Sequence, residues 1–350
     1  MTSLDLNLKH HIHYSLRPAV VEYLWGPQSS RVNILGQAKN LEGFFALYFG
    51  YYNKQCDLIG RHAKGKYSSV ESHRDIMGIA QLLQQPLTRE EVRKHMSSFL
   101  KVADKEQHET SINLVARLLL MIKFGDVPHE CRGGRYLEWS YGSLPEFVHN
   151  YFSCPPARSH DRIKLEKSFS ALNLQRIAGI EIWWTDNLAD HLRMMDDDKA
   201  IAVFHHASFL DYQIDNHANS PIFPDGFIEE TLRTIALLLP KYDQATRNWY
   251  RKVASNPGCH LDMQLVEIGN LNAESRQLEN FKYWHDRLVI LKQVYDDARP
   301  TTLSQWWYDR RNGAQWYPFW IALWVLVLTT FFGLVQCIEG ALQAYKAFRS

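Results

Sequence analysis

The stretch QWYPFWIALWVLVLTTFFGLVQCI, residues 315–338, decides the architecture of this chain. No Asp, Glu, Lys or Arg occurs from 312 to 338, a run of 27 residues, and the densest apolar part begins at Phe319. About 20 helical residues, at about 1.5 Å each, cross the ~30 Å hydrocarbon core of a bilayer. A core helix of a soluble protein rarely stays uncharged for so long. The sequence therefore predicts one transmembrane helix over 318–338, with Pro318 in its first turn.

Aromatic side chains crowd the N-terminal edge of this stretch. Because amphipathic rings prefer the headgroup level of a bilayer, we expect them to form a belt at one membrane interface. Filling a protein core is the other common use of tryptophan, but it does not explain why so many lie on one side of one apolar run. The predicted interface residues are Trp306, Trp307, Tyr308, Trp316, Tyr317 and Trp320.

Three small residues near the end of the stretch, Gly333, Cys337 and Gly340, fall at i, i+4 and i+7 and so share one helix face. Small residues let two membrane helices approach closely. This face is therefore a candidate for helix packing and self-association. It is not a GxxxG motif, and ordinary helix composition is the other interpretation.

The expected topology follows from what surrounds the stretch. Only 12 residues, 339–350, come after it, and no apolar signal-peptide region opens the chain. The next most apolar segment, ARLLLMIKFG at 116–125, is short and interrupted by Lys123. Five scattered cysteines without a CxxC pair favour reduced thiols over a disulfide framework. We therefore expect a single-pass, tail-anchored protein in the lipid bilayer, with its N-terminal domain in the cytosol.

The charge of the chain argues against a nucleic-acid-binding protein that relies on bulk positive charge. Lys and Arg number 39 against 38 Asp and Glu, which leaves a net charge of +1. Helices expected over 71–86, 87–103 and 111–125, followed by RYLEWSYG at 135–142, could be drawn as a winged helix, but they carry no basic recognition face. We favour a helical bundle and expect no nucleic acid among its partners.

The remaining pattern predicts a mainly α domain with a few short strands. Thr88 and Glu91 have capping-box spacing, and Ser143 with Pro145 opens another helix. The segment 199–213 suits an apolar strand or a buried helix, and periodicity alone does not decide between them. Further helices are expected over 143–152, 165–179, 188–195, 229–242 and 243–254, and strands over 135–142 and 180–187.

A long amphipathic helix is expected over 272–298, and Pro300 ends it. Its apolar positions recur in steps of three and four, at Leu278, Phe281, Trp284, Leu288, Leu291 and Tyr295. This helix is our candidate surface for a protein partner or a homo-oligomer. The chain is thus expected to divide into an N-terminal segment 1–69, a helical cytosolic domain 70–260, this helix 272–298, an aromatic-rich linker 299–317, the membrane helix 318–338 and a tail 339–350.

The best polar cluster lies between 190 and 211. It holds the candidate catalytic residues His191, His205, His206 and Asp211. His and Asp suit a divalent metal or general-base chemistry, but the spacing matches no established motif, and a structural polar cluster is the default interpretation. The acidic run 196–198 looks like a solvated turn. A membrane-bound metal-dependent hydrolase using this cluster is therefore an alternative function.

Common catalytic signatures are absent from the sequence. It contains no phosphate-binding glycine loop, no GxSxG and no HExxH. We therefore expect no cofactor and no metal, and we favour a non-enzymatic interaction or accessory protein.

Several segments of the chain resemble a family of uncharacterised proteins of filamentous ascomycete fungi. They include GSLPEFVHNYF at 142–152, VFHHASFL at 203–210 and, above all, the block 283–348 that begins YWHDRLVILKQVYDDARP. The resemblance covers roughly residues 70–348 and implies a mostly helical cytosolic domain with a C-terminal membrane anchor. It brings no activity and no functional residues. Proteins of this general kind can lie beside secondary-metabolite genes, which makes an accessory role in such a gene cluster a second alternative.

The layout of a helix that leads into a membrane span is also distantly similar to CorA-type magnesium transporters. Those proteins have two spans joined by a Gly-Met-Asn loop, whereas this sequence has one span and no such tripeptide. A CorA-like transporter subunit is therefore a third alternative. The uncharged span suits a helix that faces lipid rather than one that lines a pore.

Overall fold

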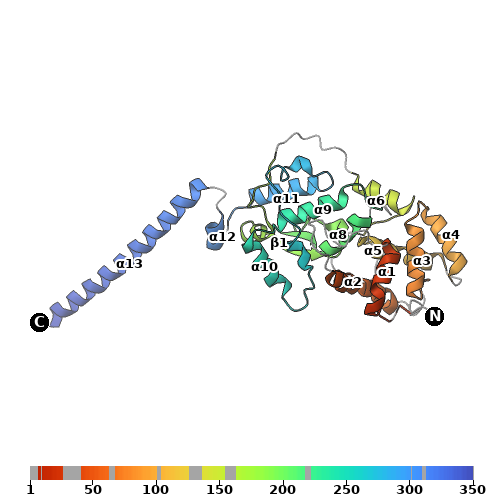
Figure 1. The fold of residues 1–350 in the computed structure, drawn as a ribbon. Coiled ribbons are helices and arrows are strands. Elements are labelled where there is room, and N and C mark those ends of the chain that lie inside the picture. Colours follow the sequence, from red (N-terminus) through yellow and green to blue (C-terminus); the bar gives the residue numbers. More distant parts are fainter. Residues whose placement is uncertain are drawn as a thin grey trace.

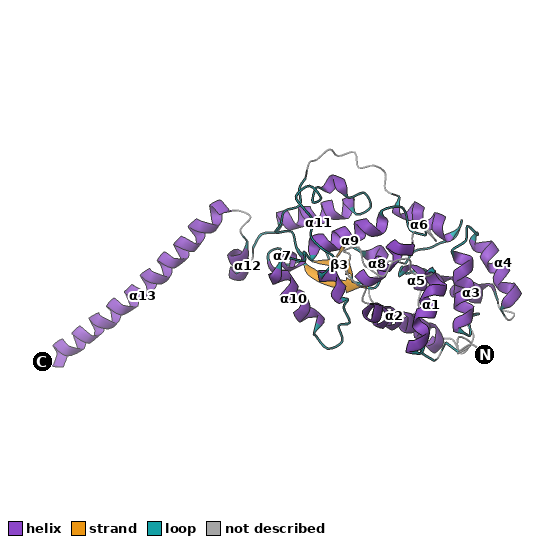
Figure 2. Ribbon diagram, in the orientation of Figure 1, coloured by secondary structure: helices purple, strands orange, loops and turns teal. Residues whose placement is uncertain are grey.

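A computed structural model of the chain describes residues 7–8, 10–26, 41–62, 68–100, 104–125, 136–153, 163–216, 222–300, 302–309 and 313–349. Over these residues the protein is mostly helical with one small sheet, which confirms the predicted fold class (Figures 1 and 2). The sheet lies in one part of the helical domain, whereas the last helix projects away from the domain (Figures 1 and 2). Of the five cysteines, Cys131 and Cys154 lie outside the described residues.

The N-terminal segment adds helices to the same hydrophobic core as the rest of the domain. A 3-10 turn, Tyr14–Leu16, leads into α1 (Arg17–Trp25), and α2 (Leu41–His62) follows. Both are bonded to the end of α5 (Lys105–Leu120). The Tyr48 hydroxyl donates to the Leu118 carbonyl (2.8 Å), and the Trp25 indole N–H donates to the Leu119 carbonyl (3.0 Å).

Capping boxes open α3 (His73–Leu83), α4 (Arg89–Phe99), α5 and α6 (Leu144–Phe152). The box at Thr88 and the Ser143 cap confirm the sequence prediction. By contrast, the strand predicted over 135–142 is wrong for the described portion of that range. Leu137 there makes only a single bridge to Phe124.

The sheet has three strands in the order β1-β3-β2, namely β1 (Glu181–Thr185), β2 (Arg193–Met195) and β3 (Ala200–Phe204). β3 is central and buried along its whole length, runs parallel to β1 and is antiparallel to β2. The strand predicted over 180–187 is confirmed as β1. The ambiguous segment 199–213 contains both alternatives, because β3 is followed directly by α8 (Ala207–Asn216).

The helix predicted over 188–195 is wrong. A 3-10 turn, Leu188–Asp190, is followed by Leu192 with a φ of 58°, which no right-handed helix permits, and then by β2. Hydrogen bonding to the open edge of β3 therefore overrides the local i, i+4 pattern of leucines. The acidic run 196–198 is confirmed as an exposed turn between β2 and β3, with φ values of 55°, 50° and 63°.

One predicted helix is shorter than expected, and two others are confirmed. In place of 165–179 the structure has α7 (Ala171–Arg176), capped by Ser170, with Gly179 in the left-handed region three residues after its end. The helices predicted over 229–242 and 243–254 are confirmed as α9 (Phe227–Leu238) and α10 (Gln244–Ala254).

The amphipathic helix predicted over 272–298 is wrong in its first half. Its range contains a 3-10 turn, Leu278–Asn280, and then α11 (His285–Asp297). The Glu230 carboxylate of α9 accepts the backbone N–H groups of Lys282 (2.7 Å), Tyr283 (2.7 Å) and Trp284 (2.9 Å). These amides are therefore bonded to a side chain of another helix at the point where α11 begins, and negative charge at this end also suits the helix dipole.

The apolar positions of this segment are nevertheless all buried, as the periodicity implies. They pack into the core of the same domain. The apolar face that we considered for a partner is thus covered within the chain, and the outward side of α11 is polar apart from the exposed Ile290.

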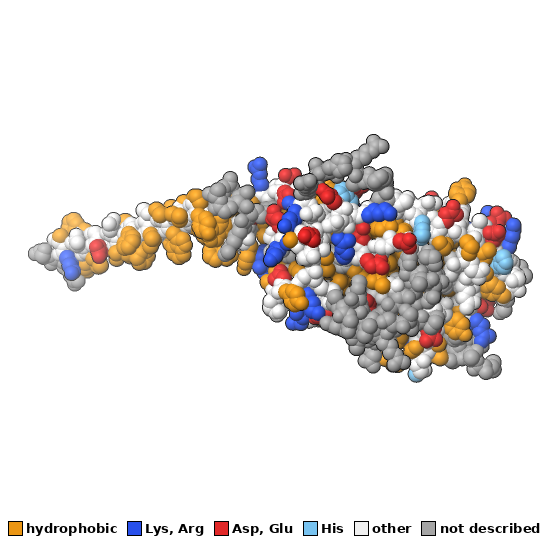
Figure 3. Space-filling model, turned by 45° about the horizontal axis from the view of Figure 1, so that its top comes forward, with side chains coloured by type: hydrophobic (Ala, Val, Ile, Leu, Met, Phe, Trp, Pro, Cys, Tyr) orange, Lys and Arg blue, Asp and Glu red, His pale blue; other side chains and the backbone are white. Residues whose placement is uncertain are grey.

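The predicted linker 299–317 contains a helix of its own, α12 (Leu303–Tyr308), which packs on α7. The Arg176 guanidinium lies 4.1 Å from the centre of the Tyr308 ring. The last helix, α13 (Gly313–Arg349), begins before the predicted span, so Pro318 lies inside the helix rather than in its first turn. Hydrophobic side chains cover α13 along its length (Figure 3).

Candidate functional site

Three polar side chains meet at one edge of the sheet, where β1 and β3 end. Because these two strands are parallel neighbours, their carboxyl ends lie side by side. Asp186 directly follows β1, and His205 with His206 directly follows β3 at the start of α8. In open α/β sheets this edge is where ligands bind. The fold thus gathers residues that are about 20 positions apart in the chain.

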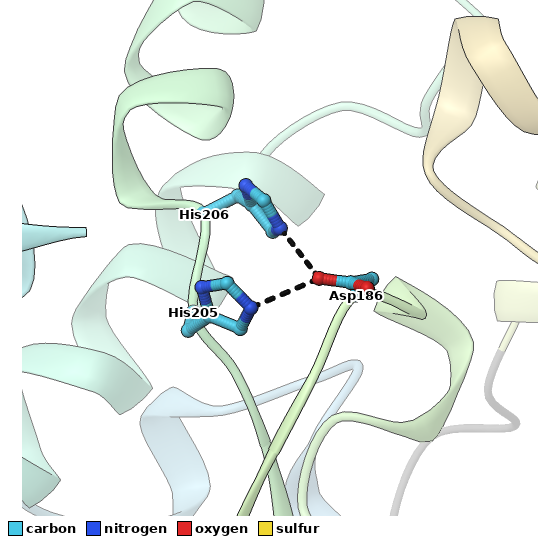
Figure 4. A group of neighbouring side chains, drawn as sticks. All are labelled: Asp186, His205 and His206. Atoms are coloured by element: carbon cyan, nitrogen blue, oxygen red, sulfur yellow. Dashed lines mark hydrogen bonds and ion pairs between the residues drawn. The ribbon is translucent and has the colours of Figure 1, made fainter. Parts of the chain in front are cut away.

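The two imidazoles converge on one carboxylate oxygen (Figure 4). The Nε2 atoms of His205 and His206 each lie 2.9 Å from Asp186 Oδ1. Their ring centres are 4.1 Å apart, with 30° between the planes. Lys54, from α2, holds the other carboxylate oxygen with Nζ 3.2 Å from Oδ2. One potential ligand atom from each of Asp186, His205 and His206 lies within 4.8 Å of the other two. Among the described residues, these three form the group of His, Cys, Asp or Glu side chains that is close enough to hold a metal ion.

Burial and hydrogen bonding have opposite effects on the pKa of Asp186 in this cluster. Burial disfavours the Asp186 carboxylate, but the hydrogen bonds from both imidazoles outweigh it and hold its pKa well below the usual range. For His206, burial lowers the pKa and the neighbouring His205 lowers it further. Asp186 is therefore ionised at neutral pH, and His206 is uncharged.

One ring atom of the cluster has no hydrogen bond. His205 is only 6% exposed, and its Nδ1 is buried without a partner, as is Ser208 Oγ one turn further on. Buried polar atoms without partners are uncommon in native proteins and need a specific explanation. The contact with the Asp186 carboxylate places a proton on His205 Nε2, and no second contact occupies its Nδ1.

The sequence candidates divide between this cluster and other places. His205 and His206 belong to it, whereas His191 does not, and Asp211 lies in α8, half-buried. Asp186 is the residue that sequence reasoning missed. The sequence places Asp186 at the end of a predicted strand, which is a position where site residues often lie. Only the parallel pairing of β1 with β3 shows that it faces the two histidines.

His191 has a structural role. It is fully buried, its Nδ1 accepts the backbone N–H of Phe204 (3.2 Å), and its Nε2 donates to Thr234 Oγ1 (2.7 Å). Burial, and then the charge of Arg287, lower its pKa to about 3. The ring is therefore neutral, with both nitrogens occupied, and it is not available to act as a ligand or a base.

The predicted interface aromatics form a packed group where α12 meets α13. Trp306 stacks on Phe319 with 4.7 Å between ring centres, and Trp307 meets Trp320 edge to face at 4.8 Å. The Trp316 indole N–H donates to the Trp307 carbonyl (3.3 Å). Tyr308 and Tyr317 lie at the same junction. The six residues thus belong to the two helices on either side of this junction, and their location at a membrane surface stays a prediction.

The predicted helix-packing face is open. Around Gly333 and Gly340, no atom of the described chain lies within 4 Å of where a Cβ would stand, and Cys337 is exposed. Self-association through this face stays a prediction.

No protein-family model, curated protein or solved structure matches the chain. The resemblances to the ascomycete family and to CorA-type transporters therefore remain expectations from the sequence.

Proposed function

We propose that this chain is a single-pass membrane protein in which α13 crosses the bilayer and holds the helical domain at one membrane face as an interaction or accessory module. One observation carries the proposal. The apolar part of α13 is Trp316–Phe348, and its most apolar 18 residues have a mean hydropathy of 2.2. None of these 18 residues is buried in the structure. A core helix of a soluble protein with this composition would be mostly buried.

The polar groups of α13 are also suited to lipid. The Thr329 hydroxyl donates to the Val325 carbonyl (2.7 Å), and Thr330 donates to Leu326 in the same way (2.9 Å). Both hydroxyls are thus satisfied within the helix, as a hydrocarbon environment requires. Tyrosine and tryptophan gather at one end of the apolar part, which fits a headgroup layer there.

The test is membrane fractionation of the full chain and of variants in α13. The wild type should stay in the pellet after an alkaline carbonate wash, and deletion of 313–350 should release the domain into the supernatant. Val327→Arg with Phe331→Arg should also release it, because each arginine at a bilayer centre costs about 2.5–3.5 kcal/mol of insertion free energy. Leu342→Arg, which lies beyond the uncharged run, is the matched control and should still pellet. A deleted chain that resists carbonate would contradict the proposal.

We further propose that the domain faces the cytosol. The described cysteines Cys56, Cys259 and Cys337 are free thiols, which suits a reducing compartment. In a variant that keeps only the exposed Cys259, a membrane-impermeant maleimide should label the protein once digitonin opens the plasma membrane. Labelling of intact cells, or labelling only after full solubilisation, would mean that the domain does not face the cytosol. A variant that keeps only Cys337 should react only in detergent, because a thiol inside the bilayer does not ionise.

A further inference from the structure

We propose that Asp186, His205 and His206 bind one divalent transition-metal ion, with a coordination position left open to water. The proposal concerns the domain alone and does not depend on how α13 meets a membrane. Two imidazole nitrogens and one carboxylate oxygen form the ligand set of catalytic zinc sites and of two-histidine, one-carboxylate iron sites. Ca²⁺ and Mg²⁺ prefer oxygen ligands alone, so this set selects against them.

The geometry needs little change to accept a metal. Zinc lies about 2.0–2.1 Å from its nitrogen and oxygen ligands, so neighbouring ligand atoms in a tetrahedral site are roughly 3.3 Å apart. In the structure, both Nε2 atoms lie 2.9 Å from Asp186 Oδ1. An opening of a few tenths of an ångström between nitrogen and oxygen would therefore admit the ion. Both imidazole nitrogens point at the Asp186 oxygen from the ends of two neighbouring strands (Figure 4), and the three ligand atoms lie within 4.8 Å of one another.

The protons of the cluster can be accounted for. Without a metal, each imidazole donates a hydrogen bond from Nε2–H to Asp186 Oδ1, so that one oxygen accepts two hydrogen bonds. A metal ion at the same point replaces both of these bonds. Both imidazoles must then carry their proton on Nδ1, and this atom of His205 has no hydrogen-bond partner in the structure and can take it. The metal-bound tautomer therefore breaks no existing hydrogen bond at His205 Nδ1.

The surroundings support one ligand oxygen and leave a path to it. Lys54 bonds to Asp186 Oδ2, which leaves Oδ1 free to ligate and orients the carboxylate, as second-shell groups commonly do. The side chains of Asp186 and Lys54 are 28% and 56% exposed, so the ion can enter from this side. Lys54 also lines a surface cleft of about 360 Å³ with His11, Asn53 and Asp57.

The experiment is metal titration of the full chain purified in detergent micelles. Calorimetry with Zn²⁺ should give one site per chain, Co²⁺ should give visible d–d absorption of a low-coordinate site, and Mg²⁺ should give neither. Asp186→Asn, His205→Gln and His206→Gln should each weaken Zn²⁺ binding by more than about 100-fold, beyond the 10–100-fold of a second-shell change. Far-ultraviolet circular dichroism would verify that each variant is folded.

Two measurements keep the proposal falsifiable. His11→Gln with His13→Gln removes exposed histidines near the N-terminus and should leave one site with unchanged affinity. If this variant loses Zn²⁺ while Asp186→Asn retains it, the proposal is overturned. If the cluster variants fail to fold, the wild type is tested by itself. A metal that binds the folded protein must raise the midpoint temperature of thermal unfolding as the Zn²⁺ concentration rises. A wild type with neither Co²⁺ bands nor a shifted midpoint has no such site.

Discussion

Replacing Trp284 by alanine should lower the free energy of unfolding by about 3–5 kcal/mol, the range for a tryptophan lost from a core. The side chain is 1% exposed and joins three regions of the domain. Its ring centre lies 5.5 Å from that of Phe227 and 4.9 Å from that of His191. Its indole N–H donates to Thr231 Oγ1 (2.9 Å), so the variant also removes a buried hydrogen bond.

Urea unfolding of the full chain in detergent micelles would measure this loss. Trp183→Ala is the matched control, because Trp183 is 42% exposed on β1 and its indole contacts only the nearby Glu181 carboxylate among the bonds described. The control should change the free energy of unfolding by less than about 0.5 kcal/mol. Equal losses at the two tryptophans would mean that Trp284 is not at the centre of the core.

The second large effect is the loss of stability in acid that His191 causes. Its pKa is about 3 in the folded protein because burial disfavours the charged ring, against about 6.5 in an unfolded chain. Between these pH values His191 is protonated in the unfolded chain but not in the folded protein. The contribution of His191 to the free energy of unfolding is therefore complete above pH 6.5 and declines as the pH falls toward 3. At pH 5, about 1.5 pH units below the pKa of the unfolded chain, the loss of unfolding free energy should be about 2 kcal/mol, because each unit corresponds to about 1.36 kcal/mol.

The comparison with His191→Gln isolates this residue. Other buried groups, among them His206 and Asp186, have lowered pKa values and add to the acid loss. The variant should be less stable than the wild type at pH 7, because the Phe204 N–H or the Thr234 hydroxyl loses its partner. The gap between the two proteins should then narrow by about 2 kcal/mol on going to pH 5. A gap that is independent of pH would mean that His191 has the same pKa in the folded and unfolded states.

The sequence predicted what depends on local chemistry. Capping side chains such as Thr88 and Ser143 act within their own first turn, and both are where the pattern placed them. The apolar steps from Leu278 to Tyr295 correctly predicted burial, because burial depends on which residues are apolar. The helical geometry of that segment was wrong before His285, because the Glu230 carboxylate arrives from another helix and sets where α11 starts.

The candidate site was half predictable for the same reason. His205 and His206 follow an apolar run and so were visible in the sequence. Asp186 became a member of the site only because β1 pairs with β3 rather than with β2, and strand order is a non-local property. His191 appeared chemically promising, but only the contacts of both ring nitrogens show that it is a structural residue.

The short connection between α12 and α13 has a consequence for how the domain meets other molecules. Only four residues, 309–312, separate these helices, and α12 is packed on α7. Fully extended, four residues reach only about 14 Å. A domain fixed so close to a bilayer would search by lateral diffusion in a thin layer, where a companion anchored in the same membrane has a far higher effective concentration than a dissolved one.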